Sequence, residues 1–148
     1  MGSESSYIRR VLVATDRSET AEVAVGWAAE LANRYEAELV LVQIVVPPSE
    51  PDPAVTDDLF KHAQELVGSR GRAVVSIHED PAKAIVEAAE SEDVDLVVVG
   101  NVGMSGRKEF LLGNVPNRVS HLTRRSCVIV NTRELVDKSQ QKKGWFRR

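Results

Sequence analysis

The chain has 148 residues, of which 43% are hydrophobic and 28% charged, so it can form a hydrophobic core without disulfides or metals. Its 19 basic and 22 acidic residues leave a net charge of −3, which argues against binding nucleic acid through a broad positive field. The single cysteine, Cys127, excludes an internal disulfide. No apolar run is long enough to span a bilayer, so we expect a cytoplasmic protein without stable membrane insertion.

Short runs of Val, Ile and Leu alternate along the chain with segments of helical period. The strand-like runs cover residues 7–15, 38–46, 73–78, 95–100 and 126–131, and helical segments begin near residues 18, 54, 81 and 115. Such alternation is typical of a parallel sheet with helices on both faces. We therefore predict one α/β domain over residues 7–133, with a flexible segment at 1–6 and a basic tail at 134–148.

Polar residues and prolines mark several of the expected boundaries. Ser18 is a good N-cap for the first helix, because its hydroxyl can accept a bond from an amide of the first turn. Pro47 and Pro48 remove backbone donors and should end the second strand. Asp80 and Pro81 predict the start of the third helix, with proline at the tolerated first position.

A glycine-rich segment lies between the fourth strand and the last helix. It holds Gly100, Gly103, Gly106 and Gly113, four of the nine glycines of the chain. Such a loop leading into a helix N-terminus can present several amides to a phosphate, although tight turns alone would also explain the glycines. Arg107 and Lys108 lie inside the segment and could neutralise outer phosphates or simply be solvated.

Asp16 follows the first strand directly. In an open α/β sheet, ligands bind beyond the carboxyl ends of the strands, where the winding direction reverses. If the first and fourth strands flank that point, Asp16 faces the glycine-rich segment and could accept hydrogen bonds from ribose hydroxyls. The alternative is that Asp16 only caps the amides of Ser18 or Glu19.

The spacing Gly100-x2-Gly103-x9-Gly113, followed by a small polar residue, resembles the nucleotide-binding pattern of universal stress proteins. Residues 15–19, Thr-Asp-Arg-Ser-Glu, are similar to the first strand-to-helix turn of that family. The resemblance runs from about residue 7 to residue 132. It implies a five-stranded, parallel, open sheet of order 3-2-1-4-5, a Rossmann-like fold of the adenine nucleotide alpha hydrolase type.

The resemblance also implies a ligand and a set of contacts. Asp16 would bind ribose, backbone near Ala14 and Ile44 would bind adenine, and the phosphates would lie near Gly100, Gly103, Arg107, Gly113, Asn114 and Val115. The implied ligand is ATP or AMP, with Mg²⁺ possible beside ATP. The phrases Gly-Asn-Val-Gly and Leu-Leu-Gly-Asn-Val-Pro are also similar to a branch of the family that binds cyclic AMP.

Asn114 departs from the pattern, because nucleotide-binding members usually carry Ser or Thr there. Its amide still offers donors, so phosphate contact stays possible, and a ligand-free dimeric scaffold is the alternative. An enzyme that hydrolyses ATP slowly or phosphorylates itself, at Ser105 for example, is a further alternative, but we predict no catalytic residue and no metal ligand. His62, His78 and His121 fall on separate predicted elements.

The chain also suggests contacts with partners. The fifth strand, from Ser126 to Asn131, is an apolar run without charge or proline, and such an edge favours pairing with a second copy. We therefore expect a homodimer through this strand, which the family resemblance also implies. The tail places Trp145 and Phe146 among basic residues and could contact an acidic partner or surface, or remain solvated.

Overall fold

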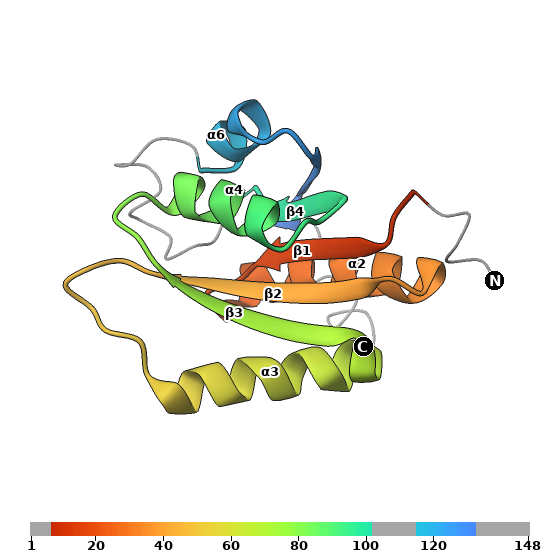
Figure 1. Ribbon diagram of the computed structural model, residues 1–148, viewed down its shortest axis with the longest axis horizontal. Coiled ribbons are helices and arrows are strands. Elements are labelled where there is room, and N and C mark those ends of the chain that lie inside the picture. The colour runs from red at the N-terminus through yellow and green to blue at the C-terminus, as the bar shows by residue number, and fades with distance from the viewer. Residues whose placement is uncertain (1–6, 102–114, 133–148) are drawn as a thin grey trace, which may run out of the picture.

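A computed structural model describes residues 7–101 and 115–132, and it has one five-stranded parallel sheet between two layers of helices (Figure 1). The elements are β1 Arg10–Ala14, α2 Glu19–Tyr35, β2 Glu38–Val45, α3 Pro53–Val67, the 3-10 turn η1 Gly68–Arg70, β3 Gly71–Ile77, α4 Pro81–Ser91, β4 Leu96–Gly100, α6 Val115–Leu122 and β5 Ser126–Val130. Within the two described ranges, no helix is both long and apolar enough to cross a bilayer.

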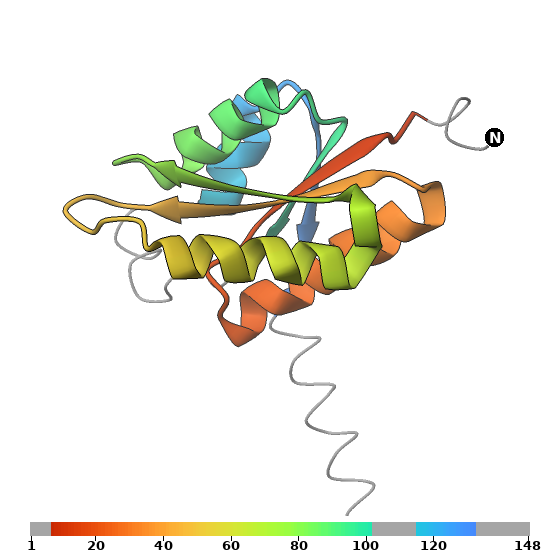
Figure 2. The ribbon, with the colours of Figure 1, turned by 60° about the horizontal axis from the view of Figure 1, so that its bottom comes forward.

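The predicted strand order is confirmed, since the sheet runs β3-β2-β1-β4-β5. The first strand lies in the centre, where Val13 is opposite Leu41 of β2 and Val98 of β4. The chain moves outward from β1 to β3, then returns through α4 to the other side of β1. Figure 2 shows α2 and α3 on one side of the sheet and α4 and α6 on the other. The winding direction therefore reverses between β1 and β4.

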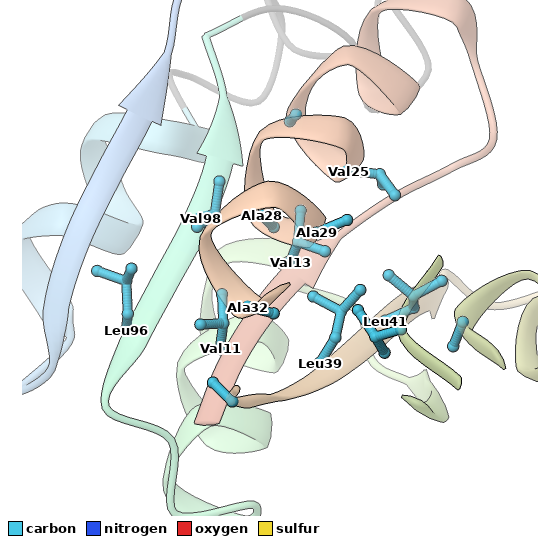
Figure 3. Close-up of a cluster of buried hydrophobic side chains, with 14 of the residues drawn as sticks. Val11, Val13, Val25, Ala28, Ala29, Ala32, Leu39, Leu41, Leu96 and Val98 are labelled. Atoms are coloured by element: carbon cyan, nitrogen blue, oxygen red, sulfur yellow. The ribbon is translucent and has the colours of Figure 1, made fainter. Parts of the chain in front are cut away.

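Both faces of the central strands are buried. Val11 and Val13 of β1 pack against the small side chains of α2 (Figure 3), whereas Leu12 and Ala14 pack into the cluster formed with α4 and α6. This two-sided burial explains why β1 is apolar at consecutive positions rather than at alternate ones. Each fully buried Val or Leu contributes about 1.5–3 kcal/mol relative to an exposed one.

The helices begin at the predicted polar residues. The Ser18 hydroxyl accepts a hydrogen bond of 3.2 Å from Ala21 N, which confirms it as the N-cap of α2. Asp80 caps α4 by accepting from Ala82 N at 3.1 Å, directly before Pro81. These side chains satisfy amides that a helix leaves without internal partners in its first turn.

Strand β3 begins at Gly71, earlier than the predicted residue 73. Gly71 is opposite Leu39 in the ladder with β2, so strand pairing extends β3 over a residue with poor strand propensity. A glycine is needed there because a Cβ atom would lie 2.6 Å from both the carbonyl carbon and oxygen of Ala63. The close approach of α3 to β3 therefore depends on this residue.

Candidate functional site

The carboxyl ends of three neighbouring strands meet at one edge of the sheet. Ala14, the last residue of β1, is opposite Val42 of β2, while Gly100 ends β4. Ile44 lies just beyond Val42 on the same strand. Since the winding reverses between β1 and β4, this edge is where ligands bind in open α/β sheets.

The structure brings several of the predicted site residues together. Ala14 and Val115 belong to the same buried apolar cluster, and Ile44 packs against it. The side chains of Ala14 and Val115 are therefore part of the core, so only the backbone atoms of these residues could contact a ligand. Gly103, Arg107, Gly113 and Asn114 lie outside the described residues, as do Ser105 and Lys108.

Asp16 is half-buried in the turn between β1 and α2. Its Oδ1 accepts a hydrogen bond of 2.9 Å from Ser18 N. Asp16 therefore caps the Ser18 amide, which was the alternative to a ribose contact. A carboxylate has about four acceptor positions, so this bond orients the group and remains compatible with a ribose contact.

Thr15, which the sequence did not single out, organises the same turn. It is fully buried, and its amide donates to Val42 O at 2.9 Å. Its hydroxyl donates to Glu22 Oε2 at 3.1 Å and accepts from Arg17 N at 2.9 Å. The sequence did contain a signal for this role, because Thr15 directly follows a buried apolar strand. A hydroxyl buried at such a position needs hydrogen-bond partners.

Asn101 joins the ends of β4 and β5 at this edge. Its amide donates to Val130 O at 2.8 Å. Its side-chain Oδ1 accepts from Thr132 N at 3.0 Å and from the buried Thr132 hydroxyl at 3.2 Å. Asn101 therefore fixes the backbone next to Gly100, a role that its position inside a glycine-rich segment did not reveal.

Helix α6, which starts at Val115, is anchored to α4 by an ion pair. Arg118 donates to the two carboxylate oxygens of Asp80 at 2.8 and 2.9 Å. This hydrogen bonding lowers the pKa of Asp80 from 3.8 to about 2, against the smaller opposing effect of burial. The amide of Asp80 also donates to His78 Nδ1 at 2.9 Å, and His78 N donates to Val45 O at 3.1 Å. The start of α6 is thus connected to the end of β2.

Comparison with known proteins agrees with this architecture. Universal stress protein Rv1636 of Mycobacterium tuberculosis is 32% identical over 145 residues, covering 86% of this chain and 99% of that protein. Universal stress protein YxiE of Bacillus subtilis is 29% identical, covering 82% of this chain and 97% of that protein. The crystal structure of a universal stress protein in complex with cAMP matches with a TM-score of 0.69 and 31% identity, covering 86% and 99% of the two chains. The model of the universal stress protein family matches residues 8–131, and this chain therefore belongs to that family, as its glycine spacing and first turn predicted.

Proposed function

We propose that this protein binds an adenine nucleotide at the carboxyl edge of its sheet, between the ends of β1 and β4. The observation that carries the proposal is the reversal of winding between these strands, which places Asp16 and Gly100 at adjacent strand ends. The 31% identical universal stress protein in complex with cAMP supports the same class of ligand. In this arrangement, Asp16 accepts from ribose and the backbone near Ala14 and Ile44 lines the adenine.

ATP or AMP is the first candidate ligand, and cyclic AMP is the second. ATP gains most if Arg107 and Lys108 reach its outer phosphates, and Mg²⁺ would accompany those phosphates. Cyclic AMP carries a single negative charge and needs only amide donors, and its esterified 3′ oxygen leaves Asp16 only the 2′-hydroxyl. The similar structure in complex with cAMP and the asparagine at position 114 are the reasons to keep this second candidate beside the first.

Calorimetric titration of ATP, AMP and cyclic AMP into ligand-free protein tests the proposal and ranks the candidates. We expect saturable binding of at least one of the three, with competition among those that bind. Native mass spectrometry of the gently purified protein would identify a ligand that survives purification. No heat and no competition from any of the three at millimolar concentration would show that the nucleotide site is absent.

We further propose that the protein acts as a homodimer that pairs through β5, in a stress or signalling role. This strand is one edge of the sheet, and its Ile129 is 41% exposed. Pairing across a two-fold axis would satisfy the open backbone groups of the edge and cover this side chain. Such a dimer would contain two nucleotide sites related by its two-fold axis.

A further inference from the structure

The side chain of Glu22 connects the first turn of α2 with two other elements. Its Oε2 accepts the hydrogen bond of 3.1 Å from the hydroxyl of Thr15, at the end of β1. Its Oε1 lies 2.6 Å from His62 Nε2 on α3. The guanidinium of Arg17 adds a longer contact of 3.9 Å between its Nε and Oε2. Glu22 thus contacts the end of β1, the turn that follows it and α3.

The bond from Thr15 to Glu22 decides which way the threonine hydroxyl points. A hydroxyl has one proton and two acceptor lone pairs, so once its proton is directed at Glu22 a lone pair can accept from Arg17 N. Because an ionised carboxylate only accepts, the proton of this bond comes from the Thr15 hydroxyl. The resulting O–H···O⁻ and N–H···O bonds close the turn around Asp16, which lies between Thr15 and Arg17.

This closed turn holds Arg17 in an unfavourable backbone conformation. Its φ is 67°, in the left-handed region that residues with a side chain rarely adopt. The conformation persists only where surrounding contacts enforce it, and the bond of 2.9 Å from Arg17 N to Thr15 Oγ1 is such a contact. If the threonine hydroxyl loses its orientation, the turn can relax, and the direction of the Asp16 carboxylate will change with it.

We propose that Glu22 is a positioning residue for Asp16 and so sets how strongly the site recognises the ribose hydroxyls. The inference rests on the proposed function, in which Asp16 contacts ribose, and it adds a residue that does not contact the ligand. Through its contact with Glu22, His62 links this recognition to α3, the helix that covers β2 and β3 on the same face.

The test compares AMP with 2′,3′-dideoxy-AMP, because only AMP offers the two hydroxyls to Asp16. In the unaltered protein, we expect AMP to bind about ten times more tightly or better, as hydrogen bonds to a charged group allow. In Glu22→Ala, this ratio should fall by about threefold or more, with the affinity for the dideoxy nucleotide kept within about twofold. A change in overall stability alone would weaken both nucleotides equally.

Three further variants separate positioning from other effects. Glu22→Gln keeps an oxygen that can accept from Thr15, so it should retain most of the ratio. Glu30→Ala is the matched control on the same helix, because Glu30 pairs with Arg34 at 3.5 Å on the exposed surface away from the turn. Thr15→Val, which removes the hydroxyl itself, should reproduce the loss and serves if Glu22→Ala does not fold.

An unchanged ratio in Glu22→Ala and in Thr15→Val would overturn the positioning role while leaving nucleotide binding intact. A loss in Glu22→Gln as large as in Glu22→Ala would also overturn it, since the hydrogen bond would then not be the cause. If the unaltered protein binds neither of these nucleotides, and neither ATP nor cyclic AMP, the proposed function itself fails. If it binds both equally, the ribose role of Asp16 fails, and the positioning role fails with it.

Discussion

The carboxylate of Asp80 and the guanidinium of Arg118 meet through two parallel contacts of 2.8 and 2.9 Å, which join helix α4 to helix α6. The same carboxylate caps α4 through Ala82 N at 3.1 Å and Lys83 N at 3.4 Å. A planar, two-pronged pair of this kind fixes orientation as well as distance. Asp80 therefore sets both the start of α4 and the position of α6 beside the proposed nucleotide site.

The ion pair between Asp80 and Arg118 predicts how the free energy of unfolding depends on pH. The pKa of Asp80 is lowered from 3.8 to about 2 in the folded protein, so its stabilisation is present above about pH 4 and is lost as pH falls toward 2. The side chains of Asp80 and Arg118 are 27% and 38% exposed, so solvent screening keeps the contribution of the pair small. Asp80→Asn should lower the free energy of unfolding at pH 7 and flatten its decline between pH 4 and pH 2. Urea unfolding at pH 7, 4 and 2.5 measures both.

The control for this experiment is Asp52→Asn. Asp52 is the N-cap of α3 and accepts from Ala54 N at 2.9 Å, so the change alters an N-cap carboxylate away from Arg118. We expect it to leave the slope between pH 4 and pH 2 close to that of the unaltered protein. An unaltered slope in Asp80→Asn as well would mean that the ion pair does not contribute.

Two glycines give opposite predictions for the same substitution. Gly71→Ala should lower the free energy of unfolding by about 1–3 kcal/mol, because its new Cβ would overlap the Ala63 backbone at 2.6 Å. Gly26→Ala in the middle of α2 meets nothing within 4 Å and should raise stability by up to about 1 kcal/mol through helix propensity. Denaturant unfolding measures the free energy of unfolding of both variants. Equal changes in the two would contradict the close approach of α3 to β3.

Local patterns were enough to predict the order of the helices and strands along the chain. Continuous apolar runs identified the buried strands, and Ser18 and Asp80 marked helix starts because caps act within a few residues. The boundary errors arose where pairing overrides propensity. The first strand begins at Arg10 rather than near residue 7, and β3 extends back to Gly71 because β2 offers a partner there.

The contacts around the candidate site were harder to predict. The bond between Thr15 and Glu22 spans a turn, and the pair between Asp80 and Arg118 joins residues 38 positions apart. Neither leaves a periodic signal, since each depends on how helices pack on the sheet. The sequence singled out Asp16 because it follows a strand expected at the centre of the sheet, and that reasoning depends on the topology of the fold rather than on local sequence.

Ile129→Lys tests the proposed dimer. A lysine at an edge position places a charge where a second strand would pack, so we expect light scattering to report a monomer. Ile77→Lys is the matched control, because Ile77 is 56% exposed on β3, the opposite edge of the sheet, and should leave the mass unchanged. A dimer of normal stability in Ile129→Lys would place the interface elsewhere.

Asp16→Ala tests the proposed ribose contact directly. Removing hydrogen bonds to a charged group costs about 1.5–3 kcal/mol of binding, so the affinity for AMP should fall about ten- to a hundredfold. The loss of the bond from Ser18 N, 2.9 Å in the folded protein, should cost only about 1 kcal/mol of stability, so the domain should remain folded. Calorimetry with AMP and with 2′,3′-dideoxy-AMP measures the effect, and the dideoxy nucleotide should bind the variant and the unaltered protein alike. Asp57→Ala, at an exposed position on α3, is the control and should change neither affinity. If Asp16→Ala weakened both nucleotides by the same factor, the aspartate would act through the shape of the turn and not through the ribose.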